Sequence, residues 1–130
     1  MANSNKKILI VDDSLMIRRI VGMILKEYNY EVISAENGLI GCEMAKANQP
    51  DLIIMDVTMP VMNGIEAAAK IKADAATAHI PVLIFTSLGS EHDIQAAEAA
   101  GVAGFLNKPI AKEELKSAVF ALLSNNSNSS

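Results

Sequence analysis

Three short apolar runs constrain the fold of this chain more than any other feature. Residues 8–11 (ILIV), 52–55 (LIIM) and 82–85 (VLIF) contain no polar side chain. Unbroken runs of this length are typical of strands that are covered on both faces, as in parallel sheets. Residues 102–106 form a less regular run, and residues 31–34 (EVIS) are more polar, which favours a strand nearer an edge. The sequence therefore predicts five strands.

Segments with helical spacing separate these runs. Between residues 17 and 28, apolar side chains recur three or four positions apart, which predicts one buried stripe on a helix. The stripe consists of Ile17, Ile20, Val21, Ile24 and Tyr28. Further helices are expected near Asn63, whose spacing from Glu66 is that of a capping box, near Ser90, and from about Lys112. The expected buried residues of the last helix are Leu115, Val119 and Leu122.

The alternation of strand and helix predicts the fold class. Five alternations indicate an α/β fold, a doubly wound five-stranded parallel sheet with right-handed crossovers and helices on both faces. The chain has 130 residues, 51% of them hydrophobic, which suits one domain with a substantial core. We expect this domain to span residues 1–124. Residues 125–130 are only Asn and Ser, and they are predicted to form a disordered tail.

Charge and cysteine content exclude several classes of function. Eleven Lys and Arg against fifteen Asp and Glu give a net charge of −4, whereas a nucleic-acid partner favours a basic surface. No apolar run approaches the roughly 18 residues of a membrane span, so no membrane partner is expected. The single cysteine, Cys42, excludes an internal disulfide and favours a reducing, cytoplasmic compartment. We interpret Cys42 as a small buried apolar residue, and the chain as a monomer.

Polar side chains follow the apolar runs directly. In chain order they are Asp12 and Asp13, Asp56, Thr86 and Ser87, and Asn107 and Lys108. Because the carboxyl ends of parallel strands meet at one edge of a sheet, these side chains are expected to lie close together. Open α/β sheets bind their ligands at this edge. The sequence therefore places three carboxylates, a threonine hydroxyl and an ammonium group at one rim.

The chemistry of this set favours a divalent cation and a phosphoryl group. Three carboxylates repel one another unless a cation is present, and an all-oxygen donor set suits Mg²⁺ or a similar hard ion such as Mn²⁺. Asp13 and Asp56 are the expected direct ligands, with Asp12 acting through a water. A carboxylate can attack phosphorus while Mg²⁺, Lys108 and the Thr86 hydroxyl together supply the positioning and the charge neutralisation that the transfer needs. Each residue alone is more often a solvated turn or strand end, so the interpretation depends on the combination.

The segments that carry these residues resemble the receiver domain of response regulators, the CheY-like domain of two-component signalling. The matching segments are ILIVDD (8–13), DLIIMDVTMP (51–60), MNG (62–64), IPVLIFT (80–86) and GFLNKP (104–109). The match runs from Lys6 to about Leu123, nearly the whole chain, and together these segments are specific to this family. The resemblance implies the strand order 2-1-3-4-5, which is that of the family's prototype and is carried over from it.

The resemblance implies a role for each charged residue of the rim. Asp56 is expected to be the phosphoacceptor. Asp12 and Asp13 are expected to form the acidic metal pair, with the backbone carbonyl of Thr58 as a further ligand. Lys108 is expected to contact the phosphoryl group.

The resemblance also implies a switch and its modulators. Thr86 is expected to move and hydrogen-bond the phosphoryl group, and Phe105 is expected to turn inward as Thr86 moves. Phe105 stands where this family often has Tyr, so no ring hydroxyl is available to a partner. Thr58 and Leu88 occupy positions that modulate dephosphorylation, and the apolar Leu88 is expected to slow it. Ser87 is the third expected modulator, because it is small enough to leave the approach of the phosphoryl group open.

The implied function is that of a stand-alone phosphorylation switch. A sensor histidine kinase or a histidine phosphotransfer protein is the expected phosphodonor. The target is expected to be a protein that binds the face made by the fourth helix, fifth strand and fifth helix. Beyond its own phosphorylation and autodephosphorylation, no enzyme activity is expected. Chemotaxis or motility is the expected pathway, and a shuttle role in a phosphorelay stays open.

Three other functions compete with this one. An aspartate-dependent phosphatase of the haloacid dehalogenase type needs a second acid two positions after its nucleophile, where this chain has Thr58. A flavin or nucleotide carrier needs a phosphate-binding loop after the first strand, where Asp12 and Asp13 would repel phosphate. A phosphate-independent pseudoreceiver usually lacks one of the acidic or lysine positions, and this chain has them all.

Overall fold

The computed structural model describes residues 6–57, 59, 61–86, 91–108 and 111–128. Strands and helices alternate throughout this part of the chain. In order they are β1 (Lys7–Val11), α1 (Leu15–Glu27), β2 (Glu31–Ala35), α2 (Gly38–Asn48), β3 (Leu52–Met55), α3 (Gly64–Ala73), β4 (Val82–Thr86), α4 (Glu91–Ala99), β5 (Gly104–Asn107) and α5 (Lys112–Asn128). Within these residues, no helix is both long and apolar enough to cross a lipid bilayer.

The five strands form one parallel sheet in the order β2-β1-β3-β4-β5. This confirms both the doubly wound α/β fold and the expected strand order. In the register, Ile8 of β1 lies opposite Val32 on one side and Leu52 on the other. The winding changes direction between β1 and β3, so the ends of these two strands lie at the point where such folds bind ligands.

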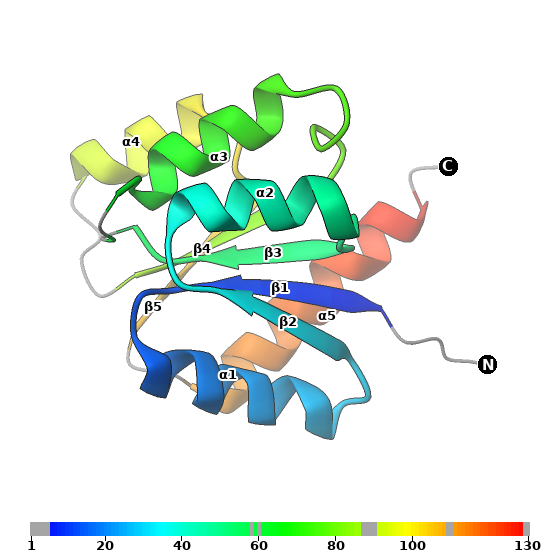
Figure 1. The fold of residues 1–130 in the computed structure, drawn as a ribbon. Helices are drawn as coiled ribbons and strands as arrows, with labels where there is room; N and C mark the ends of the chain where they lie inside the picture. Colours follow the sequence, from blue (N-terminus) through cyan, green and yellow to red (C-terminus); the bar gives the residue numbers. More distant parts are fainter. Residues whose placement is uncertain (1–5, 58, 60, 87–90, 109–110, 129–130) are drawn as a thin grey trace.

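The helices form two layers, one on each face of the sheet. α2, α3 and α4 cover one face, and α1 and α5 cover the other (Figure 1). Leu9 and Val11 of β1 pack in the core beneath α2, α3 and α4, whereas Ile8 and Ile10 pack beneath α1 and α5. Because successive strand residues point to opposite faces, a strand covered on both sides needs apolar residues at every position.

The two edge strands differ from the central ones as the sequence predicts. In β2 only Ala35 is buried, which confirms the expectation of a strand at an edge. β5 begins at Gly104, two residues later than the apolar run suggested. The reason is that the amide of Val102 donates to the carbonyl of Ala97, at the end of α4, instead of entering the sheet.

Helix α1 buries a different stripe from the one predicted. Its buried residues are Val21, Gly22 and Leu25, while Ile20 is 38% exposed. Val21 and Leu25 lie four apart and point into the sheet, and this rotation leaves Ile20 on the outer flank. The expected stripe was therefore wrong at Ile20. It was right at Val21, and Ile17 and Ile24 pack partly against the core.

The other predicted helices differ mainly at their ends. The capping box of α3 is present, with the Glu66 amide donating to Asn63 Oδ1 over 2.9 Å and the Asn63 amide donating to Glu66 Oε1 over 3.2 Å. In α5, Leu115 and Val119 are buried as expected, and Leu123 is buried rather than Leu122. α5 continues to Asn128, so it takes in residues 125–128 of the segment expected to be a tail. Asn and Ser each disfavour a helix by about 0.5 kcal/mol, which is too little for a single such residue to end the helix.

Candidate functional site

The candidate site lies where the carboxyl ends of four strands meet. Asp12 follows β1, Asp56 follows β3, Thr86 ends β4, and Lys108 follows β5. The strands end level with one another, because Val11 is in register with Met55 and Thr86 with Asn107. The parallel sheet therefore gathers at one rim residues that lie far apart along the chain.

Asp12 is the most constrained residue of the rim. It is 2% exposed, and each of its polar atoms has a partner. Its amide donates to the carbonyl of Ala35 over 3.1 Å, and its own carbonyl accepts from Nη1 of Arg18 over 2.6 Å. Oδ1 accepts from the amide of Ser14 over 2.9 Å, and Oδ2 accepts from Nζ of Lys108 over 3.0 Å. The turn after β1 is thus tied to β2, to α1 and to the end of β5.

Asp56 is positioned by its backbone. Its amide donates to the carbonyl of Val11 over 2.9 Å, which continues the pairing of β3 with β1 beyond the last strand residue. Gly64, at the start of α3, packs directly on the other side. A Cβ atom at Gly64 would overlap the carbonyl oxygen of Asp56, so only glycine fits this approach. The amide of Gly64 donates to the carbonyl of Val57 over 2.8 Å and closes the loop.

Lys108 joins the carboxylates across the rim. Its Nζ atom lies 3.0 Å from Oδ2 of Asp12 and 3.5 Å from Oδ1 of Asp56, and the side chain is only 18% exposed. The same ammonium group lies 5.5 Å from the centroid of the Phe85 ring, within the range of a cation–π contact. Its backbone amide donates to the carbonyl of Thr86 over 2.9 Å. The ammonium group is therefore held inside the site.

Three carboxylates are close enough to share one cation. Oxygen atoms from Asp12, Asp13 and Asp56 all lie within 4.8 Å of one another. Asp12 and Asp56 are buried, while Asp13 is exposed and leaves the cluster open to solvent on its side. An open set of carboxylate oxygens fits Mg²⁺, which binds few protein ligands and keeps several waters.

The electrostatics of Asp56 reflect the same crowding. Burial raises the pKa of its carboxyl group above the ordinary value of 3.8, and the neighbouring charge of Asp12 raises it further. The charge and hydrogen bond of Lys108 and the amide of Val57 act in the opposite direction and lower this pKa. Lys108 therefore helps to keep Asp56 ionised, as a nucleophile or a metal ligand must be.

Comparison with known proteins identifies the family. The model of the response regulator receiver domain matches residues 8–120. The chain belongs to this family. The chemotaxis protein CheY of Halobacterium salinarum is 40% identical to it over 118 residues, 91% of this chain and 97% of that protein. Protein PilH of Pseudomonas aeruginosa is 36% identical over 117 residues, 90% of this chain and 97% of that protein. The structure of the Vibrio cholerae chemotaxis protein CheY4 matches with a TM-score of 0.87 at 34% identity, covering 92% of this chain and 99% of that one.

The chain is thus a receiver domain of two-component signalling, a family that binds Mg²⁺ in an acidic pocket and interacts with histidine kinases and downstream targets. The structure of this receiver domain brings together Asp12, Asp13, Asp56 and Lys108, the four charged residues that the sequence placed at the rim. Their chemical roles stay predictions.

The two expected switch residues lie on the strands beside this cluster. Thr86 is 5% exposed, and its carbonyl receives the hydrogen bond from Lys108. Phe105 lies in β5 opposite Ile84, and its half-buried ring packs against the core on the side of α2, α3 and α4. Thr58, Ser87 and Leu88, the expected backbone ligand and modulators, lie outside the described residues.

Two residues of the receiver site were not predicted from the sequence. Arg18 reaches back from α1 to the carbonyl of Asp12, and no motif in the sequence signals this contact. The ring of Phe85 lies beside the Lys108 ammonium group, although the sequence predicted only its place in a strand. A signal for Phe85 was available, because it immediately precedes Thr86 at the end of an apolar run.

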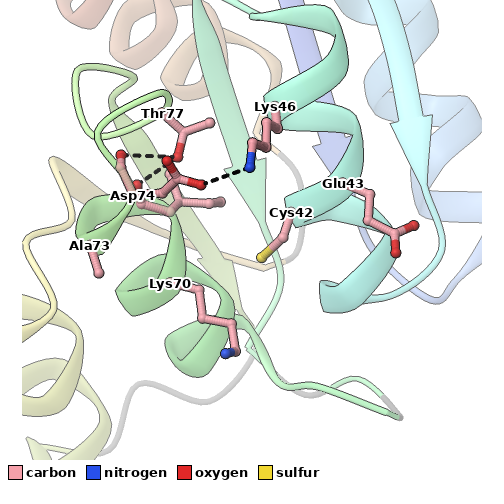
Figure 2. Close-up of a pocket in the computed structure, with 8 residues that line it drawn as sticks. Cys42, Glu43, Lys46, Lys70, Ala73, Asp74 and Thr77 are labelled. Atoms are coloured by element: carbon pink, nitrogen blue, oxygen red, sulfur yellow. Dashed lines mark hydrogen bonds and ion pairs between the residues drawn. The ribbon is translucent and has the colours of Figure 1, made fainter.

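Cys42 lies away from the receiver site, in a groove between α2 and α3. Figure 2 shows its sulfur atom between the two helices, with the ion pair of Lys46 and Asp74 (3.6 Å) at one end of the groove. The thiol donates to the carbonyl of Ala67 over 3.6 Å. Burial raises the pKa of Cys42, so the thiol stays protonated at neutral pH. This supports the interpretation of Cys42 as a packing residue, although it is half-buried rather than fully buried.

Proposed function

We propose that this receiver domain is a phosphorylation-dependent signalling switch that accepts a phosphoryl group on Asp56 in the presence of Mg²⁺. One observation carries the proposal: a single ammonium group, Nζ of Lys108, contacts the carboxylates of both Asp12 and Asp56. A structural ion pair needs one carboxylate for one lysine. Here one ammonium group contacts two carboxylates, and a third, that of Asp13, lies within 4.8 Å of both, which leaves an excess of negative charge suited to a divalent cation.

The three aspartates would hold the metal ion. Asp12 is buried and fully hydrogen-bonded, Asp56 is buried beside it, and Asp13 faces solvent, where the ion and its waters have access. When bound, Mg²⁺ or Mn²⁺ neutralises the carboxylates and stabilises charge on the phosphoryl oxygens.

Asp56 would act as the nucleophile. Its carboxylate oxygen attacks phosphorus in the phosphohistidine of the donor, the P–N bond breaks, and the electron pair returns to the imidazole nitrogen. The attack needs the ionised carboxylate, and Lys108 favours that state by lowering the pKa of Asp56 against the effect of burial. The Lys108 ammonium group lies close enough to move from the carboxylates onto a phosphoryl oxygen. We propose no activity on external substrates, only this transfer and the hydrolysis of the resulting acyl phosphate.

The switch would operate through the ends of β4 and β5. The hydrogen bond between Lys108 and Thr86 ties these two strand ends together, so a movement of either residue is transmitted to the other. Phe105, two residues before Asn107 in β5, is half-buried and can change its exposure when Thr86 moves. A phosphoryl group that contacts Thr86 and Lys108 in only one conformation would shift the population toward it. The target would bind the face of α4, β5 and α5.

The pathway we propose is chemotaxis or another form of motility control. Its support is the similarity to the chemotaxis protein CheY and to PilH, each of which this chain matches over nearly its whole length. The phosphodonor would be a sensor histidine kinase or a histidine phosphotransfer protein. We also propose a cytoplasmic location, supported by a half-buried cysteine that is kept as a free thiol.

The test is the intact mass of the protein after incubation with acetyl phosphate, with and without Mg²⁺. The wild type should gain one phosphoryl group only with Mg²⁺, and Asp56→Asn should gain none. Asp51→Asn is the matched control, because the Asp51 carboxylate accepts from the Lys7 amide over 2.8 Å, away from the rim, and this variant should be labelled normally. Stable labelling of Asp56→Asn would refute the assignment of the phosphoacceptor. A wild type that gains no mass under any condition would instead be a pseudoreceiver.

A further inference from the structure

The proposed chemistry makes no use of the contact between Arg18 and the backbone carbonyl of Asp12. Arg18 is the fourth residue of α1, and its backbone amide donates to the carbonyl of Ser14 over 3.0 Å in the first turn of the helix. Its side chain turns back along the helix, and Nη1 donates to the backbone carbonyl of Asp12 over 2.6 Å. The side chain is half-buried, whereas the side chain of the adjacent Arg19 is exposed.

The Asp12 carbonyl belongs to the peptide unit that joins Asp12 to Asp13. A hydrogen bond from a charged donor to this oxygen fixes the plane of the peptide and therefore the direction in which Asp13 leaves it. On the other side of Asp13, the Ser14 amide is held by Oδ1 of Asp12 over 2.9 Å. Both backbone neighbours of Asp13 are thus fixed by hydrogen bonds.

Asp13 depends on this backbone for its orientation. Its side chain is exposed, and none of the hydrogen bonds among the described residues involves its carboxylate. Asp12 and Asp56, in contrast, are buried and held by Lys108. Of the three carboxylates that lie within 4.8 Å of one another, Asp13 is the one without a side-chain hydrogen bond or ion pair among the described residues, so its backbone alone sets its place in the cluster.

We infer that Arg18 is a positioning residue for the divalent-cation site: by holding the Asp12 carbonyl, it orients the peptide that aims Asp13 at the ion. This inference rests on the proposed function, since it requires that Mg²⁺ binds to the three aspartates. Arg18 does not contact the ion or the phosphoryl group, and it acts through the backbone of Asp12.

The charge and the geometry of Arg18 affect cation binding in opposite directions. A positive charge near a divalent cation repels it, so loss of the charge alone should tighten Mg²⁺ binding. Loss of the hydrogen bond should weaken binding, because the ligand carboxylate is no longer oriented. Residues that orient metal ligands change metal affinity by about 10- to 100-fold when they are removed. The sign of the change therefore separates a positioning role from a purely electrostatic one.

The test compares Arg18→Ala with Arg19→Ala, which removes the same charge from the next residue of the same helix. Isothermal titration of the full chain with MgCl₂ should give a Kd raised about 10-fold in Arg18→Ala. In Arg19→Ala the Kd should be unchanged or slightly lower. Arg18→Lys keeps the charge but lacks the planar guanidinium that reaches the carbonyl, so it should recover only part of the affinity.

A second readout needs no metal. In the metal-free protein, the amide proton of Ser14 should exchange with solvent faster in Arg18→Ala than in the wild type or in Arg19→Ala. Thermal unfolding of each variant without Mg²⁺ checks that the domain is folded, and Arg18→Lys provides a second variant if Arg18→Ala is unstable.

Three results would overturn the inference. The first is a Kd in Arg18→Ala that equals or falls below that of the wild type. The second is equal weakening in Arg18→Ala and Arg19→Ala, which would assign the effect to the helix as a whole. The third, a wild type that binds no Mg²⁺, would remove the proposed function as well. Normal Mg²⁺ binding by the wild type combined with no effect of Arg18→Ala would overturn the inference alone.

Discussion

Replacing Asp56 by Asn should stabilise the metal-free protein at neutral pH. Asp56 is 6% exposed and lies beside two other carboxylates, so its charge is both poorly solvated and repelled. Asparagine has nearly the same shape, and its side-chain oxygen can still accept from Nζ of Lys108. The substitution therefore removes the charge and leaves the packing intact.

The magnitude follows from the distances in the site. At an effective dielectric constant of about 20, Asp12 at up to 4.8 Å repels Asp56 by about 3.5 kcal/mol, and Lys108 at 3.5 Å attracts it by about 4.7 kcal/mol. The exposed Asp13 also repels Asp56, and solvent screening halves this repulsion to about 1.7 kcal/mol. The two repulsions together then exceed the attraction by Lys108, so the negative charge of Asp56 is unfavourable. Burial adds to the cost and is the largest cause of the raised pKa of Asp56. We expect a gain of about 1–2 kcal/mol in the free energy of unfolding.

The gain should depend on pH with a defined sign. The pKa of Asp56 is raised in the folded protein, so the folded state binds a proton that the unfolded state has already released. The cost of the charge is absent below the unfolded pKa of about 3.8, grows as the pH rises from there to the higher folded pKa, and is constant above it. The difference between Asp56→Asn and the wild type should therefore be small near pH 3 and largest at neutral pH.

Urea denaturation with and without MgCl₂ measures this difference. Without the ion, Asp56→Asn should unfold at higher urea than the wild type. With Mg²⁺ at about 100 times its Kd, the wild type should gain about 2.7 kcal/mol and lose its disadvantage. Asp74→Asn is the control of opposite sign. The Ala76 amide and the Lys46 charge lower the pKa of Asp74, so its carboxylate stabilises the fold at neutral pH, and this contribution disappears as the pH falls through the lowered pKa. A neutral or destabilising effect of Asp56→Asn at pH 7 would refute the electrostatic reasoning.

Two further substitutions test the loop between β3 and α3. Gly64→Ala should destabilise the domain by about 3 kcal/mol or more and reduce labelling by acetyl phosphate, because the new Cβ would overlap the Asp56 carbonyl oxygen and only backbone movement can relieve the overlap. Urea denaturation measures the loss of stability, and intact mass measures the labelling. A variant of wild-type stability would contradict the close approach of α3 to Asp56. Val61→Gly should stabilise the domain by about 1 kcal/mol, because Val61 has a φ of 70°, which is unfavourable for a β-branched residue. The Val61 side chain is 74% exposed, so little packing is lost when it is removed. A lower urea midpoint in this variant would show that the left-handed backbone is not strained there.

Most of the fold could be predicted from the sequence because both faces of the sheet are covered. A strand between two helical layers must be apolar throughout, so the apolar runs at residues 8–11, 52–55 and 82–85 predicted the central strands directly. The sequence was less able to predict which face of α1 is buried. Ile20 and Val21 are adjacent and equally apolar, and only the packing of α1 on the sheet decides that Val21 is buried and Ile20 is not.

The candidate site was predictable to the extent that it follows from strand ends. Asp12, Asp56 and Lys108 each follow a strand, and the register of the sheet brings them together without further information. Arg18 could not be predicted in this way, because its contact with the Asp12 carbonyl depends on the direction of one side chain on α1. The crowding at Gly64 likewise depends on how closely α3 approaches the Asp56 backbone, and the sequence shows only a glycine at the start of a helix.

The ion pair between Asp12 and Lys108 joins residues that are 96 positions apart in the chain. Lys108 is held at the rim by β5, an edge strand that pairs with β4. A chain still being synthesised can therefore form β1, β3 and their carboxylates well before the ammonium group that balances them is available. Until β5 docks, the acidic cluster lacks its counter-charge, and the same edge strand carries the expected switch residue Phe105. The counter-charge of the acidic cluster and the expected switch residue therefore both depend on the last strand to be synthesised.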